Sequence, residues 1–229
     1  MITADTPAGR VLARSASRDD GPFMCPACAA PVIIKKGEIV SHHFAHARHS
    51  DCDYGAGETE LHRNVKEAVY DSIAGHPLCR RVQLEAAVGG NRADVLVETA
   101  EFGVYPGGEV QSPSTVAIEI QRSNLPVSEL DARTDKYSQS GVKVIWVVAE
   151  PESILDNPYR STVRTRDWHR WIHDIMGRVY VWRFAGMFAV VRLDDVTRFD
   201  DFGPYELVTK KRAAVEGQVH ITNLVFDYD

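Results

Sequence analysis

The sequence predicts a mixed α/β protein, in which a small metal-binding segment precedes a core with the order helix, strand, strand, strand, helix, strand (αβββαβ). Two observations support this class. Apolar residues recur at helical spacing in two segments and fit buried strands in four others. A segment rich in Cys and His stands before the first of these helices and has few apolar residues of its own. We therefore expect a mixed central sheet with flanking helices and an N-terminal module resembling a zinc finger.

Composition and charge indicate a globular protein without a membrane span. The chain has 229 residues, 44% of them hydrophobic and 25% charged, which is typical of a globular protein. It lacks the long apolar run of a membrane span and the apolar stretch of a secretory signal, so we expect a cytoplasmic protein that does not bind membranes. The net charge is −6, but residues 1–50 carry six Lys/Arg against four Asp/Glu, whereas residues 51–160 carry ten against eighteen. An acidic middle is typical of a site for divalent cations, and also of a solvated acidic surface.

Changes in composition divide the chain into four parts. Residues 1–20 are polar and without periodicity, so we expect a flexible lead. Residues 21–56 form a compact Cys/His segment that needs a metal to fold. Residues 57–150 contain the αβββαβ pattern, and residues 151–229 form a C-terminal extension of that core.

The elements of the core are predicted from apolar periodicity and turn residues. The first helix ends before Gly75, and Gly89-Gly90 is typical of the tight turn of a β-hairpin. The patterns predict core helices at 58–74 and 128–140 and core strands at 81–88, 92–98, 115–121 and 142–148. Beyond the core they predict a helix at 167–176 and short strands at 178–183 and 188–193.

The Cys/His segment has the ligand spacing of a structural zinc site. Cys25 and Cys28 are separated by two residues and can bind one Zn²⁺ from a single turn. The other two ligands are two of the three residues His43, His46 and Cys52. We expect His46 and Cys52, with His43 as the alternate. The alternative interpretation is a metal-free loop with a chance Cys-x-x-Cys pair.

Acidic and amide residues gather on two neighbouring predicted strands. Alternation along a strand places Glu119 and Gln121 on one face, and Asp94 lies on the preceding strand. Two carboxylates on adjacent strands can share one Mg²⁺ or Mn²⁺, which lowers the pKa of a bound water and neutralises charge on a phosphate. Gln121 then stands where it could orient the attacking water. Taken singly, however, such residues are more often surface or capping groups.

Two polar stripes accompany these residues on the flanking helices. Glu58, His62 and Lys66 recur every four residues on the first helix, and Arg133 and Tyr137 stand four apart on the second. Such a stripe is usually a solvated face. Here two of them flank one candidate metal site.

The ordered series of motifs resembles the competence protein CoiA-like nuclease family. The match runs from about Phe23 to Tyr180. It is carried by Cys25-Pro-Ala-Cys28, His43-Phe-Ala-His46, Gly57-Glu58 with His62 and Lys66, Arg92-Ala-Asp94-Val95, Ala117-Ile-Glu-Ile-Gln121, Arg133 with Tyr137, and Val144-Ile-Trp-Val147.

The resemblance implies a PD-(D/E)XK nuclease-like core that hydrolyses DNA with Mg²⁺ or Mn²⁺, in DNA uptake, recombination or defence, alongside DNA-processing partners. It implies that Asp94 and Glu119 bind the ion and that Gln121 takes the place of the Lys found in the wider superfamily. Glu58 corresponds to the acid of the first core helix. We expect these four residues to be catalytic and Arg133 and Tyr137 to contact DNA. We expect His62 and Lys66 either to contact the DNA backbone or to order the site.

Two other functions are weighed against the nuclease. The first is a binding or regulatory module that keeps the nuclease fold without turnover, and the second is a zinc-stabilised scaffold unrelated to nucleic acid. Intact Asp94, Glu119 and Gln121 favour the nuclease over an inactive module, which would be free to lose any of them. A scaffold has no need for an acidic site.

Overall fold

The computed structural model describes residues 1–48, 50–103, 110–150, 162–200 and 202–226, together with residues 153, 155, 157 and 160. The chain forms two compact units, Met1–Glu67 and Ala68–Asp229. Helix α1 (Glu60–Ala74) runs across the division between them. None of the helices in the described ranges is long and apolar enough to span a membrane.

The first unit is built on a five-stranded sheet with the order β2-β1-β3-β4-β5. Its elements are β1 (Thr3–Thr6), β2 (Gly9–Leu12), the 3₁₀ turn η1 (Arg18–Asp20), β3 (Phe23–Met24), β4 (Pro31–Lys35) and β5 (His43–His46). The apolar core under this sheet includes Phe23, Val32, Ile34 and Phe44. The rings of Phe23 and Phe44 pack with their centroids 5.0 Å apart.

Residues 1–20, expected to be a flexible lead, instead form part of this sheet. Strands β1 and β2 pair as a hairpin, and Asp5 on β1 forms a salt bridge with Arg10 on β2 at 2.8 Å. Ala4 and Ala13 are buried in the core of the unit. These strands are only four residues each, and Val11 and Leu12 are their only large apolar residues, so they leave little apolar periodicity in the sequence.

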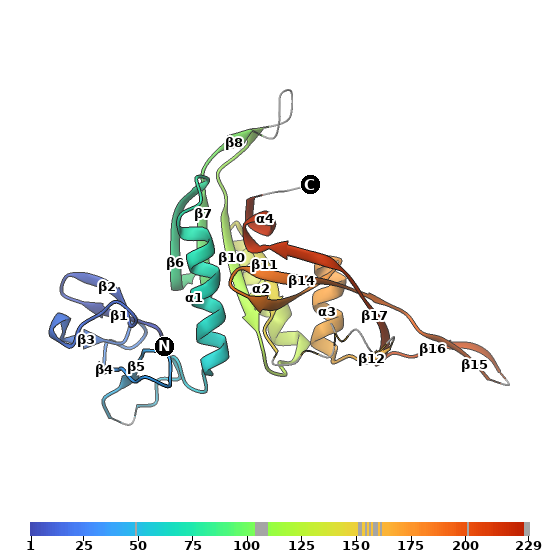
Figure 1. Ribbon diagram of the computed structural model, residues 1–229, viewed down its shortest axis with the longest axis horizontal. Helices are drawn as coiled ribbons and strands as arrows, with labels where there is room; N and C mark the ends of the chain where they lie inside the picture. The colour runs from blue at the N-terminus through green and yellow to red at the C-terminus, as the bar shows by residue number, and fades with distance from the viewer. Residues whose placement is uncertain are drawn as a thin grey trace. The chain divides into compact units, whose positions relative to one another are not determined.

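The second unit is built on an eight-stranded mixed sheet with the order β12-β17-β14-β13-β11-β10-β7-β6 (Figure 1). Its strands are β6 (Cys79–Val88), β7 (Asn91–Thr99), β10 (Thr115–Gln121), β11 (Val142–Val148), β12 (Val163–Arg164), β13 (Val179–Phe184), β14 (Met187–Asp194) and β17 (Lys210–His220). Strand β11 is parallel to both β10 and β13, whereas the other neighbours are antiparallel. The order α1-β6-β7-β10-α2-β11 confirms the predicted αβββαβ pattern.

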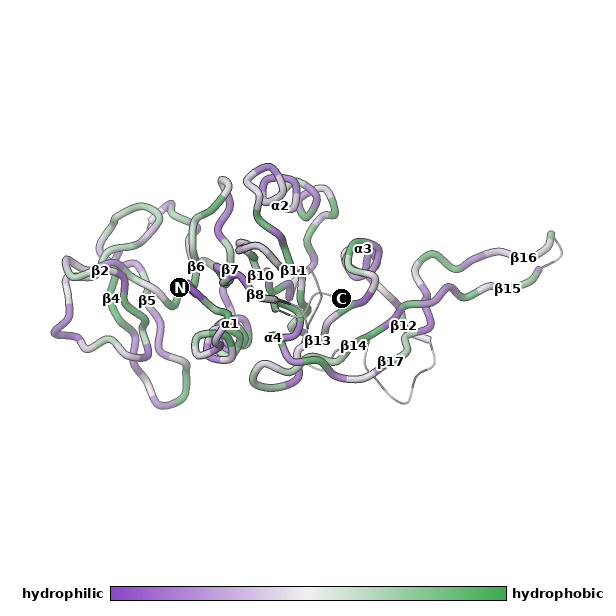
Figure 2. Tube along the Cα trace, turned by 90° about the horizontal axis from the view of Figure 1, so that it is seen from above, coloured by the Kyte–Doolittle hydropathy of each residue, from purple (hydrophilic) through white to green (hydrophobic). Residues whose placement is uncertain are grey.

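The helices α2 (Val127–Gln139) and α3 (Asp167–Met176) pack against the sheet and against each other. Figure 2 shows hydrophilic and hydrophobic colours alternating around both helices, as expected of helices that pack on one side only. Leu130 of α2 and Trp168 of α3 are fully buried in one core with Trp146 of β11. The indole of Trp146 also donates a hydrogen bond to Thr134 on α2 at 3.1 Å, which fixes the helix over the sheet.

The C-terminal part of the chain extends the same sheet. The predicted helix at 167–176 and the two strands that follow it are present as α3, β13 and β14. The ambiguous final residues form β17, which pairs along the whole of β14, and the short helix α4 (Ile221–Phe226). Two hairpins are appended: β8 (Phe102–Gly103) with β9 (Val110–Gln111), and β15 (Thr197–Asp200) with β16 (Gly203–Glu206).

Candidate metal centre and catalytic site

Four side chains of the first unit converge as the sequence predicts for zinc. The ligand atoms of Cys25, Cys28, His46 and Cys52 all lie within 4.8 Å of one another. The Cys28 sulfur lies 3.4 Å from Nε2 of His46, and the sulfurs of Cys25 and Cys52 are 4.0 Å apart. Four N and S ligands around one Zn²⁺ lie about 3.3–3.8 Å apart. This Cys₃His cluster could therefore bind zinc with small adjustments of its side chains.

The register of β5 explains why His46, and not His43, joins the cluster. Side chains three residues apart on a strand point to opposite faces of the sheet. His46 is paired with Val32, whose side chain is in the core, whereas His43 is paired with the exposed Lys35. The ring of His43 is instead close to the carbonyl oxygen of Ser41, with its Nδ1 at 2.9 Å.

The thiols of the cluster differ in their environment. The backbone amide of Ala30 and the ring of His46 lower the pKa of the exposed Cys28 thiol to about 6. Burial raises the pKa of Cys25, whose sulfur lies in the core of the unit. A thiolate at Cys28 is the form that binds a metal ion.

Asp94 and Glu119 stand where strands β7 and β10 separate. The last paired residues of the two strands are Val95 and Ile118. One step further along the ladder, Asp94 and Glu119 occupy opposing positions, which places them on the same face of the sheet. Pairing stops at this step, so the two carboxylates lie at a fork rather than within a continuous ladder.

The Asp94 carboxylate takes the place of a strand partner at this fork. Its Oδ2 accepts a hydrogen bond from the backbone amide of Ile120 at 2.9 Å. This contact satisfies an amide that the separating strands leave without a ladder partner. It also holds Asp94 next to Glu119, and the charge of Asp94 contributes to the raised pKa of Glu119.

Glu119 is 1% exposed and is surrounded by partners from α2. Its Oε2 accepts a hydrogen bond from Arg133 at 2.6 Å, and its Oε1 accepts one from the hydroxyl of Tyr137. Burial and the neighbouring Asp94 raise the pKa of Glu119 to about 8, while Arg133 and Tyr137 act in the opposite direction. A divalent cation bound by both carboxylates would relieve their mutual repulsion. Carboxylate oxygens are the ligand type of a hard cation such as Mg²⁺, and both oxygens of Glu119 here accept hydrogen bonds.

Arg133 and Tyr137 turn toward the sheet instead of forming a solvated stripe. Tyr137 is fully buried, so the structure does not place it to contact DNA as the sequence analysis expects. The guanidinium of Arg133 lies 5.6 Å from the ring centre of Trp146, and its backbone carbonyl accepts a hydrogen bond from Asn91 at 2.8 Å. Arg133 keeps 29% of its side chain exposed. Both residues position Glu119, and only Arg133 is accessible to a ligand.

Gln121 lies two residues after Glu119 on β10, and alternation puts both side chains on the face that α2 covers. Gln121 is 6% exposed, and its amide nitrogen donates a hydrogen bond to the backbone carbonyl of Ser123. The amide is thus held in one orientation by the backbone of the same loop.

Glu58, His62 and Lys66 form a group of their own within the first unit. Glu58 forms an ion pair with Lys66, and its Oε1 lies 3.9 Å from Nδ1 of His62. Lys66 is 3% exposed. This burial and the ion pair with Glu58 favour the interpretation in which Lys66 orders the site over the one in which it contacts DNA, and its role stays a prediction. The contribution of Glu58 to catalysis stays a prediction.

Glu85 on β6 is a feature that the sequence reasoning missed. The register pairs Leu84 with Val95 and Ala86 with Ala93, which leaves Glu85 opposite Asp94. Glu85 is 3% exposed, and its φ of 53° lies in the left-handed region that favours glycine. Buried acids in strained backbone are typical of functional sites. Its position opposite the predicted Asp94 is the one signal that could have identified it.

Comparison with models of protein families gives two matches. Residues 12–55 match the competence protein CoiA N-terminal domain, and residues 58–185 match the competence protein CoiA nuclease-like domain. A search of curated proteins and a search of solved structures give no match. The second domain covers more than half of the chain and contains the fork with Asp94 and Glu119, while the first contains the Cys₃His cluster. The chain belongs to the competence protein CoiA family and carries both its N-terminal and its nuclease-like domain.

Proposed function

We propose that this protein hydrolyses phosphodiester bonds in DNA with a Mg²⁺ or Mn²⁺ ion bound by Asp94 and Glu119. The observation that carries the proposal is the fork between β7 and β10, where both carboxylates stand at opposing positions of one face. The match to a nuclease-like domain supports DNA as the substrate class. The overall charge of −6 favours local contacts near the fork over broad electrostatic capture.

The protein's own residues have distinct roles in this mechanism. Asp94, fixed by the amide of Ile120, and Glu119, fixed by Arg133 and Tyr137, hold their oxygens in place for a cation before substrate arrives. When bound, the ion supplies charge neutralisation at the phosphate and lowers the pKa of a water molecule. Gln121 orients that water toward the phosphorus, and Arg133 contacts a phosphate oxygen with its exposed edge.

A structural Zn²⁺ in the Cys₃His cluster is the second part of the proposal. The cluster joins β5 and the segments around Cys25, Cys28 and Cys52, so a bound zinc would cross-link the first unit. The four ligand positions are all filled by the protein. A closed set of this kind is typical of structural zinc and leaves no position for a reacting water.

Cleavage of labelled DNA tests the catalytic proposal. Single-stranded and duplex DNA are incubated with Mg²⁺, with Mn²⁺ or with EDTA, beside Asp94→Asn and the control Glu98→Gln. Glu98 lies on the same strand, four residues away, and pairs at the surface with Arg81 at 3.5 Å. We expect divalent-dependent cleavage that Asp94→Asn lowers by roughly a hundredfold or more and that Glu98→Gln leaves unchanged.

One observation favours a second candidate function. Both carboxylate oxygens of Glu119 already accept hydrogen bonds, from Arg133 and from Tyr137. A module that had lost turnover could keep this arrangement for stability alone and still bind DNA. If no form of DNA is cleaved with either ion, while DNA is bound equally by wild type and Asp94→Asn, the binding module replaces the nuclease.

A further inference from the structure

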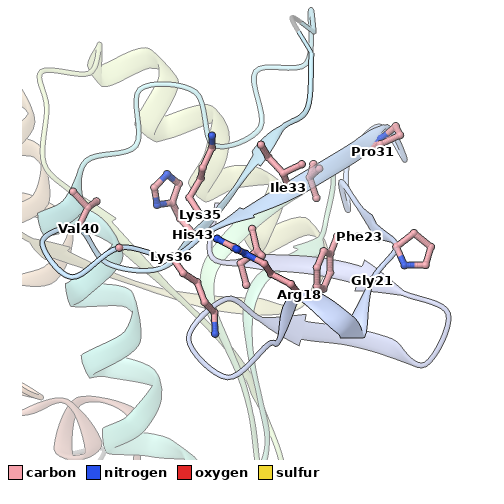
Figure 3. Close-up of a pocket in the computed structure, with 13 residues that line it drawn as sticks. Arg18, Gly21, Phe23, Pro31, Ile33, Lys35, Lys36, Val40 and His43 are labelled. Atoms are coloured by element: carbon pink, nitrogen blue, oxygen red, sulfur yellow. The ribbon is translucent and has the colours of Figure 1, made fainter.

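The first unit contains an open pocket of about 740 Å³ on the outer side of strand β4 (Figure 3). Its wall is formed by β4 and the residues that follow it, by His43 at the start of β5, and by Arg18 and the stretch from Gly21 to Phe23. The Cys₃His cluster uses the inward-facing side chain of His46, so the pocket belongs to the other face of the same two strands. Neither the proposed catalytic site nor the zinc cluster accounts for it.

Strand alternation explains the chemistry of the pocket floor. Val32 and Ile34 line the pocket from the buried side of β4, whereas Pro31, Ile33 and Lys35 alternate with them and are exposed. An outward-facing row on a small sheet is usually polar, yet Ile33 is 42% exposed. Val40, also 42% exposed, and the exposed Pro22 add to this apolar floor.

Cationic groups surround the apolar floor. Lys35, Lys36 and Arg18 line the pocket, and Figure 3 shows their nitrogen ends distributed around it, with the ring of His43 between them. No acidic residue is among the described lining residues. Within the ranges that the structure describes, none of these three cations forms a salt bridge. Their charge is therefore available to an anionic ligand.

We propose that this pocket binds single-stranded nucleic acid. A ligand that suits this pocket must have both an apolar part for the floor and negative charge for the surrounding cations. Unpaired bases can pack flat on Pro31, Ile33 and Val40, while the phosphates that flank them lie against Lys35, Lys36 and Arg18. A duplex hides the faces of its bases, so it could use the cations but not the floor.

The pocket also differs from the acidic fork in its charge. Residues 1–50 carry a small excess of Lys/Arg, whereas residues 51–160 are strongly acidic. Binding of the strand by the first unit would supply the electrostatic attraction that the acidic part of the chain lacks. The inference does not depend on cleavage, because a strand can be bound at this pocket whether or not the fork hydrolyses it.

The test measures binding of the full, zinc-loaded chain without added Mg²⁺ or Mn²⁺. The probe is a fluorescein-labelled oligothymidylate about 12 nucleotides long, within the site size of small single-strand binders. The first variant, Lys35→Ala/Lys36→Ala, removes two positive charges from the pocket. The second, Ile33→Ser, replaces an exposed apolar side chain of the pocket with a small polar one. Arg48→Ala is the matched control, because Arg48 is exposed in the same unit and does not line the pocket. Zinc content and circular dichroism verify that each variant is folded.

We expect the double lysine variant to bind the oligonucleotide at least ~10-fold more weakly. The slope of log K against log salt concentration should become shallower by about 1.4, which is 0.7 for each of two phosphate contacts. Ile33→Ser should weaken binding severalfold with an unchanged salt dependence, and a duplex should bind more weakly than the single strand. The inference is overturned if the double lysine variant and Ile33→Ser both bind the oligonucleotide as tightly as Arg48→Ala does. It is also overturned by equal binding of duplex and single strand, or by capture of the chain by phosphatidylserine vesicles without binding of the oligonucleotide.

Discussion

The carboxylate of Asp94 accepts a hydrogen bond from the backbone amide of Ile120 at 2.9 Å, and this contact holds it beside Glu119 at the fork between β7 and β10. The hydrogen bond does two things at once. It satisfies an amide that has lost its strand partner, and it restricts the Asp94 side chain before any ion or substrate is present. A preorganised pair of carboxylates is what a divalent metal site requires.

Removal of the Tyr137 hydroxyl tests whether α2 positions Glu119. Tyr137→Phe keeps the buried ring but loses the hydrogen bond to Glu119, worth about 1.5–3 kcal/mol when a bound cation keeps that carboxylate charged. We expect cleavage to fall roughly tenfold or more, since each 1.36 kcal/mol is tenfold in rate. DNA binding should not change, because Tyr137 is buried. Tyr180→Phe on β13 is the control. Weaker DNA binding by Tyr137→Phe would instead support a direct DNA contact.

Replacement of Gln121 by lysine tests the role of this position. A lysine ammonium can also donate a hydrogen bond to the Ser123 carbonyl, and it brings a positive charge toward the attacked phosphate. We expect Gln121→Lys to keep or gain cleavage activity, and Gln121→Ala to lose most of it. The comparison uses cleavage rates at equal Mg²⁺. Loss of activity in a folded Gln121→Lys protein, as complete as in Gln121→Ala, would contradict a role in orienting water.

Metal analysis of two histidine variants tests the zinc assignment. Because His46 contacts Cys28 and His43 faces the opposite side of β5, we expect His46→Ala to lose zinc and His43→Ala to retain about one zinc per chain. Cys28→Ser should lose zinc as well, together with the order of the first unit. Full zinc content in Cys28→Ser and His46→Ala would show that the cluster is not the site.

Two substitutions at Glu85 test the backbone strain opposite Asp94. In an ordinary strand, Ala is more stable than Gly by about 0.5–1 kcal/mol. At a φ of 53° the order should reverse, since a left-handed conformation costs a residue with Cβ about 1–2 kcal/mol. We therefore expect Glu85→Gly to unfold at higher denaturant than Glu85→Ala. The usual order, with Ala more stable, would show that the strand relaxes and stores no strain.

Much of the core could be predicted from the sequence. Strand β11 is a nearly continuous apolar run, and β10 has apolar residues on both sides of Glu119. The Gly89-Gly90 turn fixes the hairpin of β6 and β7, with φ of 59° and 71° at the two glycines. The spacing of the cysteines and histidines narrowed the zinc ligands to Cys25, Cys28, Cys52 and either His46, the expected choice, or His43, and the observed cluster contains His46. In each case a local pattern carried the information, because alternation and ligand spacing act over a few residues.

Other features depend on tertiary contacts that no local pattern records. Spacing alone showed that Arg133 and Tyr137 share a side of α2, but not that this side faces the sheet. The spacing of Glu58, His62 and Lys66 showed one shared stripe, but not that Lys66 is buried in an ion pair with Glu58. The N-terminal hairpin escaped prediction because its core residues include small ones such as Ala4 and Ala13, whose burial leaves little apolar signal.

The central claim is that Asp94 and Glu119 together bind one divalent cation. Titration calorimetry of the zinc-loaded chain with Mn²⁺ tests it most directly, on wild type, Asp94→Asn, Glu119→Gln and the surface control Glu98→Gln. The account predicts one Mn²⁺ equivalent in wild type and in Glu98→Gln, and its loss in each of the other two variants, because both carboxylates share the ion. Equal Mn²⁺ binding by wild type, folded Asp94→Asn and folded Glu119→Gln would contradict the account.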